Sequence, residues 1–439
     1  MDLFFDRYCR HLAARDRRLA WNMVYGILRQ RQYLDEIIGS VSSRPLQKLH
    51  ADVLMALRLG VYQLCFLGRI PASAAVNETV QAFRNLGRPR WLVNFVNGVL
   101  RAAARSPRGR PAGTGEGKSD EMLNHPGWLL KRWQKRWGTA VAREICLANN
   151  QPPVLTIRVN TGRITPVALQ QRMEQAGYRA DPGIYVDTAL RLPQPHLHVP
   201  DLPGYHAGLF HVQDEAAQLA TMLLALFAPA HHYLDGCGGV GGKSCQLAGL
   251  LAHGGRLTVL EPDRRRYGLL QANLGRLGLL SATRCLRCSL QEFATSSSCS
   301  FDGVLVDAPC SGTGVIRKHP DIRWNRHPKD LLVRQRYQLD LLAAAAPLVR
   351  YGGILVYATC SLEEEENDQV ISRFLAAHPE FHQTSCAPWL PAPARSLVDA
   401  SGFFRPLPQQ QISGFFACRM VRSRVDDAKK PSCLQILVG

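Results

Sequence analysis

Two cysteines stand where buried strands are predicted to end. Cys310 follows the apolar run Val304–Val306 and the sequence Asp307-Ala-Pro, and Cys360 follows the run Gly352–Thr359. Short apolar runs bounded by glycine and proline are typical of buried strands. In an open parallel sheet, ligands bind at the carboxyl ends of the strands, so both thiols are expected beside a substrate. A lone thiol is more often a small buried hydrophobe, but two at equivalent strand ends favour a function.

The chemistry that needs such a thiol is methylation of C5 of a pyrimidine. C5 of cytosine is a poor nucleophile until a thiolate adds to C6. The activated carbon then attacks the methyl sulfonium of S-adenosylmethionine, and loss of the C5 proton and of the thiol restores the ring. Two cysteines allow one to attack and the other to assist release. The cationic run Arg317-Lys318-His319, after the turn Ser311–Gly314, favours an anionic substrate.

A glycine-rich loop predicts the cofactor site. Gly236, Gly238 and Gly241 match G-x-G-x-x-G between a predicted strand and helix, and Glu261 ends the next strand. The helix N-terminus favours a carboxylate or phosphate, and the acid accepts hydrogen bonds from ribose hydroxyls. The motif predicts an adenosine-type cofactor without separating nicotinamide from S-adenosylmethionine. No metal is expected, because the single Cys285-Leu-Arg-Cys288 motif has no partner pair and is interpreted as structural.

Alternating strands and helices must position these groups. From Val212 onward, the pattern predicts a doubly wound, mostly parallel α/β sheet of the Rossmann-like type. The predicted strands are Tyr233–Leu234, Leu257–Leu260, Thr283–Leu286, Gly303–Val306, Ile354–Tyr357 and the late Gly414–Val421. The predicted helices between them are Lys243–Leu251, Arg264–Leu277 and Lys329–Leu348.

The rest of the chain divides by composition. Helical periodicity predicts an all-α domain at 1–104, and a Pro, Gly and Ser-rich linker follows at 105–121. A small α+β module is predicted at 122–208, the α/β domain at 209–423 and a polar tail at 424–439. The tryptophan stripe of the α+β module is interpreted as core rather than as a base-stacking platform.

Composition bounds the class of protein. The 439 residues are 46% hydrophobic and 20% charged, as in ordinary globular proteins, with no apolar run of about 18 residues for a membrane span. The net charge of +18 indicates a polyanionic partner, and residues 1–118 hold 19 Lys and Arg against 8 Asp and Glu. The 13 scattered cysteines and the absence of a signal peptide pattern favour reduced thiols in the cytoplasm.

Assembled, these motifs resemble the Sun/NOL1/NOP2 family of RNA cytosine-5 methyltransferases, and above all its bacterial members that act on small-subunit ribosomal RNA. The resemblance covers nearly the whole chain. It is carried by Asp-Ala-Pro-Cys-Ser at 307–311, Thr-Cys-Ser at 359–361, RKHPDIRW at 317–324, Gly-Phe-Phe at 414–416, IPASAAVNETV at 70–80, FVNGVLR at 95–101, HPGWLLKRW at 125–133 and VQDEAAQ at 212–218.

The resemblance implies a NusB-like RNA-binding domain at 1–104, S-adenosylmethionine as cofactor, small-subunit ribosomal RNA as partner and a cytoplasmic monomer. It implies that Cys360 is the nucleophile and that Cys310 assists release of the product. Asp307 would contact the cytosine or the cofactor, and Lys243 would reach the active site. The residues expected to hold the cofactor are Cys237, Gly238, Gly239, Val240, Gly241, Gly242, Lys243, Glu261 and Asp307.

Two departures from the family pattern predict a weakened hold on the cofactor. The family loop reads Cys-Ala-Ala-Pro-Gly-Gly-Lys, whereas Gly238, Gly239 and Val240 stand here, and these are expected to loosen the loop. The acid that follows the third strand in the family is replaced by Arg287, Cys288 or Ser289.

Two alternatives stay open. A nicotinamide-dependent oxidoreductase would explain the glycine fingerprint but neither the paired cysteines nor the basic helical domain. A non-enzymatic, antitermination-like RNA-binding protein with a degenerate methyltransferase domain would explain the altered loop only. A DNA cytosine methyltransferase shares the chemistry but lacks the Thr-Cys-Ser thiol.

Overall fold

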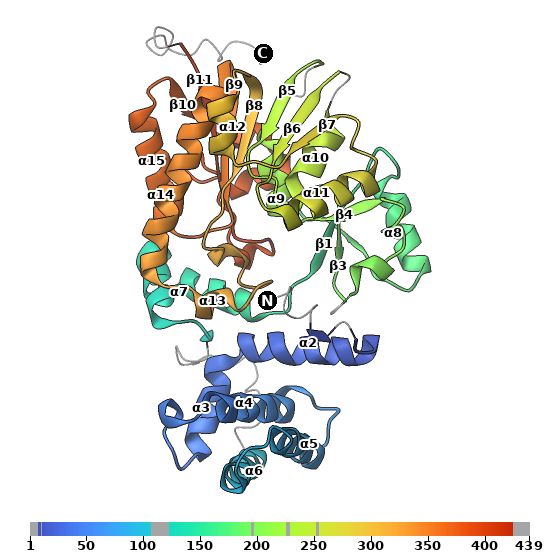
Figure 1. Ribbon diagram of the computed structural model, residues 1–439, viewed down its shortest axis with the longest axis vertical. Helices are drawn as coiled ribbons and strands as arrows, with labels where there is room; N and C mark the ends of the chain where they lie inside the picture. Colours follow the sequence, from blue (N-terminus) through green and yellow to red (C-terminus); the bar gives the residue numbers. More distant parts are fainter. Residues whose placement is uncertain are drawn as a thin grey trace. The chain divides into compact units, whose positions relative to one another are not determined.

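The apolar runs of the C-terminal half form one seven-stranded sheet in the computed structural model (Figure 1). Its order is β10-β11-β9-β8-β5-β6-β7, in which β5 to β9 run parallel and β10 and β11 are antiparallel at one edge. The predicted doubly wound fold is therefore confirmed. The strands are β5 His232–Asp235, β6 Arg256–Leu260, β7 Thr283–Leu286, β8 Phe301–Asp307, β9 Val349–Thr359, β10 Phe381–Thr384 and β11 Phe416–Arg422.

Helices cover both faces of this sheet. One face packs against α9 Glu215–Met222, α10 Gly242–Leu250 and α11 Arg264–Leu277, and the other against α12 Leu290–Ser296, α14 Pro328–Ala345 and α15 Asp368–Ala377. Along β8, Leu305 contributes to the first core, whereas Val304 and Val306 contribute to the second. Because both faces are buried, the strands read as continuous apolar runs rather than alternating ones.

A second, antiparallel sheet forms the small α+β module. Its order is β2-β3-β1-β4, from β1 Leu155–Val159, β2 Asp181–Pro182, β3 Ala189–Leu192 and β4 Phe210–Val212, with α8 Pro166–Gln175 alongside. The Glu215 carboxylate at the start of α9 accepts backbone N–H groups of Tyr185 (2.6 Å) and Val186 (3.0 Å). These hydrogen bonds fasten the module to the domain of the seven-stranded sheet.

Residues 8–9, 11–106, 123–194, 197–224, 229–251 and 254–424 are described by the structure, and they form two units. The larger comprises Pro152–Val315 and Arg326–Gly439, and the smaller comprises Met1–Gln151 together with Ile316–Asn325. The predicted linker at 105–121 and tail at 424–439 lie, except for residues 105, 106 and 424, outside the described residues.

The smaller unit is all-helical. It holds α2 Ala14–Arg29, α3 Arg31–Val41, α4 Ala51–Phe66, α5 Ala72–Arg84, α6 Arg90–Arg105 and α7 Gly127–Asn150. Leu57, Val61, Val96 and Leu100 are fully buried in the core of α3 to α6. Trp133 on α7 is also buried, in agreement with its interpretation as core. None of the helices in the described ranges has the length and apolar character of a membrane span.

The segment Ile316–Asn325 belongs to the smaller unit, although the residues on either side of it belong to the larger unit. Its short helix α13, Ile322–Asn325, carries the fully buried Arg323. The Arg323 guanidinium donates to the carbonyls of Asn124 (2.8 Å) and Asn149 (3.0 Å), and burial lowers its pKa to about 9. The Trp324 indole donates to the Leu28 carbonyl at 2.7 Å. The RKHPDIRW motif is thus part of the core of the N-terminal unit.

Candidate active site

The predicted catalytic residues meet at the carboxyl ends of neighbouring strands. β8 pairs with both β5 and β9, and in this register Asp307 lies beside Ala358. Cys310 and Cys360 follow these two strand ends, so the expectation that their strands are neighbours is confirmed. The Gly314 N–H donates to the Cys360 carbonyl at 2.9 Å, which fastens the loop after β8 to the end of β9.

The two thiols contact each other directly. The sulfur atoms of Cys310 and Cys360 are 3.3 Å apart, within hydrogen-bonding distance. Donation from Cys310 lowers the pKa of the Cys360 thiol, and the positive charge of Lys243 acts in the same direction. The same hydrogen bond raises the pKa of Cys310 well above its usual value. The site therefore distinguishes a thiolate-prone Cys360 from a proton-holding Cys310.

A partly buried ion pair lies near the thiols. The Lys243 ammonium donates to Asp307 Oδ2 at 2.7 Å and lies 5.0 Å from the centre of the Phe415 ring. Burial disfavours the charged amine, but attraction by Asp307 and the hydrogen bond to it raise the pKa of Lys243. Lys243 therefore remains a cation at neutral pH, and it supplies positive charge where a thiolate would form.

The glycine loop connects β5 to α10 and is held by its backbone. The Gly236 and Gly238 N–H groups donate to the carbonyls of Leu305 and Leu260, both at 2.9 Å. A Cβ at Gly238 would stand 2.4 Å from Val259 Cγ1, and Gly239 has a left-handed φ of 56°. Alanine is therefore unfavourable at both positions, and the expected looser loop stays a prediction. A Cβ at Gly239 would meet nothing within 4 Å, which leaves room for a ligand above the loop.

One of the two acids expected around the loop is present, and the other is not. Glu261 is buried at the end of β6, next to the loop, and accepts the Asp263 N–H at 2.9 Å. After β7, Ser289 caps α12 in a reciprocal arrangement with Glu292, and Arg287 is exposed. The structure thus places no carboxylate at 287–289. A group of three or more His, Cys, Asp or Glu side chains suited to a metal ion does not occur within the described parts of the chain.

Two acidic positions in the site were missed from the sequence. Asp235 at the end of β5 is buried and accepts the Ser244 hydroxyl (2.7 Å) and the Cys237 N–H (3.2 Å). Burial raises the pKa of Asp235 to about 6. Glu366 is fully buried behind the cysteines. Its signal was a run of four glutamates shortly after a buried strand, and periodicity does not distinguish the two buried members, Glu363 and Glu366, from the others.

Comparison with known proteins matches all three parts of the chain. The family described as "16S rRNA methyltransferase RsmB/F" matches residues 222–421. The "NusB family" matches residues 4–105, and the ferredoxin-like domain of RsmF/B-like methyltransferases matches residues 125–199. These matches confirm the expected NusB-like, α+β and Rossmann-like parts in their predicted order.

Relatives match most of the length of the chain. The probable ribosomal RNA small subunit methyltransferase B of Bacillus subtilis is 33% identical over 93% of this chain and 91% of its own length. The ribosomal RNA small subunit methyltransferase B of Pseudomonas putida is 36% identical over 83% of this chain and 82% of its own. A methyltransferase homologue from Pyrococcus horikoshii superposes with a TM-score of 0.58 at 26% identity, over 68% of this chain and 96% of that one. These relationships favour a methyltransferase over a nicotinamide-dependent oxidoreductase. The chain belongs to the RsmB/F family of 16S rRNA methyltransferases.

Proposed function

We propose that this protein transfers a methyl group from S-adenosylmethionine to C5 of a cytosine in small-subunit ribosomal RNA. The observation that carries the proposal is the pair of sulfur atoms, 3.3 Å apart, at the ends of two adjacent parallel strands. Family membership supports ribosomal RNA as the substrate, and the charge of +18 suits a polyanion. A ribosomal substrate implies a cytoplasmic location, and we propose that the protein acts as a monomer.

Cys360 is the proposed nucleophile. Its thiol has a lowered pKa because Cys310 donates a hydrogen bond to it, and Lys243 adds positive charge nearby. The thiolate attacks C6 of cytosine, which gives C5 the electron density to accept a methyl group. After transfer, solvent water takes the C5 proton, the electron pair of that C–H bond restores the C5–C6 double bond, and the C6–sulfur bond breaks to release the Cys360 thiolate. Cys310 assists this release, since its S–H hydrogen bond stabilises the departing Cys360 thiolate.

Asp307 is proposed to orient the base. Its Oδ2 is engaged by Lys243, whereas no hydrogen bond to Oδ1 is found among the residues that the structure describes. That free oxygen, on a side chain that is 31% exposed, suits the exocyclic amino group of cytosine. Lys243 would hold the carboxylate in place through its hydrogen bond to Oδ2.

The residues present fit S-adenosylmethionine. That cofactor, when bound, supplies the methyl group. The loop Cys237–Lys243 would hold it, with open space at Gly239, and Glu261 and Asp307 would complete the site. The N-terminus of α10 favours a carboxylate at this place, since its first N–H groups lack helical partners.

The test is methylation of 16S rRNA in vitro with tritiated S-adenosylmethionine, followed by bisulfite sequencing. We expect one cytosine to become resistant to deamination with the native protein, and none with Cys360→Ala. Label incorporated on another base, or on a ribose hydroxyl, would contradict the C5 assignment. Absence of label with every form of the substrate would favour the non-enzymatic RNA-binding alternative.

A further inference from the structure

One fully buried carboxylate, that of Glu366, touches the residues that follow both cysteines. Glu366 Oε1 accepts the backbone N–H of Ser311 at 2.8 Å, and the Ser311 hydroxyl also donates to this carboxylate. Oε2 accepts the Ser361 hydroxyl at 2.5 Å. Ser311 directly follows Cys310 and Ser361 directly follows Cys360, so a single side chain joins the two thiol-bearing loops.

The surroundings hold this carboxylate rigidly. Gln338 on α14 donates to Glu366 Oε1 (3.1 Å) and to the Pro309 carbonyl (3.0 Å). The Tyr357 hydroxyl donates to the Glu366 carbonyl at 2.7 Å. A buried charge is strongly unfavourable unless it is hydrogen-bonded, and here donors from three different elements satisfy it. The donors thus fix the carboxylate, and the carboxylate in turn fixes the loops.

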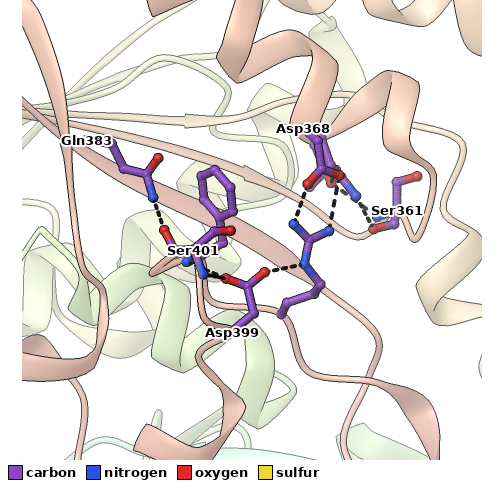
Figure 2. Close-up of polar contacts among 9 residues, drawn as sticks. Ser361, Asp368, Gln383, Asp399 and Ser401 are labelled. Atoms are coloured by element: carbon purple, nitrogen blue, oxygen red, sulfur yellow. Dashed lines mark hydrogen bonds and ion pairs between the residues drawn. The ribbon is translucent and has the colours of Figure 1, made fainter. Parts of the chain in front are cut away.

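The next two residues extend the same support. Asn367 accepts the Thr359 hydroxyl (2.7 Å) and donates to the Ser361 carbonyl (2.9 Å). The Arg405 guanidinium donates to Asp368 at 2.6 Å and to Asp399 at 2.8 Å. Figure 2 shows both carboxylates directed at one guanidinium group. The segment that carries Glu366 is therefore anchored on both sides, at the end of β9 and at the start of α15.

Glu366 does not activate the nucleophile. The hydrogen bond with Cys310 lowers the pKa of Cys360, whereas the negative charge of Glu366 acts in the opposite direction. A carboxylate near a thiolate is electrostatically unfavourable, so the contribution of Glu366 must lie in geometry. Without it, two hydroxyls and one backbone N–H would be buried without their acceptor, and the loops would rearrange.

We infer that Glu366 is a positioning residue that sets the separation of the Cys310 and Cys360 sulfur atoms by holding Ser311 and Ser361 together. Its effect on catalysis rests on the proposed function, but its effect on the thiol pair does not. A displacement of about 1 Å in a reacting group can lower a rate by about a hundredfold. Loss of the carboxylate is therefore expected to reduce turnover while substrate and cofactor binding persist.

The test compares Glu366→Gln, Glu366→Asp and Ser361→Ala with the matched control Glu364→Gln, an exposed glutamate of the same turn. Two quantities are measured on the full chain. One is the rate at which dibromobimane joins Cys310 to Cys360, followed by peptide mass spectrometry. The other is turnover on 16S rRNA, together with KM for RNA and affinity for S-adenosylmethionine.

Glu366→Gln is expected to slow both cross-linking and turnover by about tenfold or more, with KM and cofactor affinity within about twofold of native. Glu366→Asp, which keeps the charge, should recover part of both rates. Ser361→Ala keeps the carboxylate and its contacts with Ser311, so it should lower both rates by a smaller factor. This variant replaces Glu366→Gln in the comparison if Glu366→Gln does not fold. Glu364→Gln should behave as native.

Cross-linking and turnover of Glu366→Gln equal to those of Glu364→Gln would overturn the inference. So would an Asp variant no better than the Gln variant, because Asp keeps two acceptor oxygens for the Ser311 and Ser361 donors and Gln keeps only one. If the native protein cross-links but methylates no cytosine, the proposed function fails, and the cross-linking comparison still decides the role of Glu366.

Discussion

Cys310 and Cys360 are separated by 50 positions in the chain, yet their sulfur atoms lie 3.3 Å apart. The hydrogen bond between them makes the two thiols unequal, since it lowers the pKa of Cys360 and raises that of Cys310. Chemically identical side chains thus enter the proposed reaction with different proton affinities, and their replacements are expected to give different products.

Cys360→Ala should lose methylation by about a thousandfold or more, because no covalent bond to C6 forms, while RNA and cofactor still bind. Cys310→Ala should form the covalent bond and release it slowly. The product would be a protein–RNA band in a denaturing gel that disappears with nuclease. Replacement of the exposed Cys299 is the control. A trapped band with Cys360→Ala instead would reverse the two roles.

The charge of Lys243 should be visible in the pH dependence of alkylation. Because a hydrogen bond and a nearby cation lower the pKa of Cys360, its reaction with iodoacetamide should begin at lower pH than that of an ordinary thiol. Lys243→Met removes the cation, so the midpoint should move to higher pH. Peptide-resolved mass spectrometry would follow Cys360, with Cys299 in the same sample as reference. If the midpoint does not move, Lys243 does not lower the pKa of the Cys360 thiol.

Asp235 should give stability an unusual pH dependence. Its pKa is about 6 in the folded protein against an ordinary value of 3.8, so the folded state binds more protons between these limits. Stability contributed by this group is therefore lost as pH rises from about 4 to 6, by on the order of 3 kcal/mol. Urea unfolding at several pH values should show a flatter profile for Asp235→Asn. Identical profiles would mean that Asp235 titrates normally.

Alanine in the glycine loop should weaken cofactor binding, contrary to the expectation from the sequence. Gly238→Ala places a Cβ 2.4 Å from Val259 Cγ1, an overpacking that typically destabilises by about 1–3 kcal/mol. Gly239→Ala strains a left-handed backbone by about 1–2 kcal/mol. The control is Gly249→Ala, because Gly249 lies on α10, the helix that follows the loop, and a Cβ there would meet nothing within 4 Å. Calorimetry showing tighter binding for either loop variant would restore the idea of a degraded loop.

RNA affinity should depend on exposed arginines of the helical unit. Arg69, Arg90 and Arg101 are exposed. Replacing all three by alanine should lower the slope of log affinity against log salt by about 2 to 3, since each phosphate contact contributes about 0.7 to 0.9. The corresponding lysine variants should keep the slope. An unchanged slope in the alanine variant would assign RNA binding to other surfaces.

Much of the catalytic site follows from the sequence because parallel strands end at a common edge. The runs before Asp307 and Cys360 are continuous and apolar, so their strand ends and their closeness could be predicted. The strands β5 to β9 and β11 were all found, whereas the short β10 was not. Phe381–Thr384 has a single large apolar residue, and its pairing with β11 depends on tertiary contacts.

Glu366 and the meaning of Gly238 could not be predicted in the same way. The glutamates of the run are the same residue type, so the sequence does not say which of them is buried beside the cysteines. The donors Ser311, Ser361 and Gln338, which distinguish Glu366, come from distant parts of the chain or from the preceding turn. Similarly, glycine in place of alanine looked like added freedom until Val259 proved to occupy the space of a side chain. Neither the role of Glu366 nor the crowding at Gly238 could be predicted, because a sequence pattern shows propensity but not the neighbours across the fold.

The placement of Ile316–Asn325 within the N-terminal unit has a consequence for synthesis of the protein. Domains usually fold in order as the ribosome makes them, at about 5–20 residues per second. Here the buried partner of the Asn124 and Asn149 carbonyls is Arg323, which is made only after about three quarters of the chain. We therefore expect the smaller unit to complete its folding late, after most of the larger unit has left the ribosome. Nascent chains halted before residue 316 should have a protease-sensitive α7, and chains halted well beyond residue 325 should be protected there.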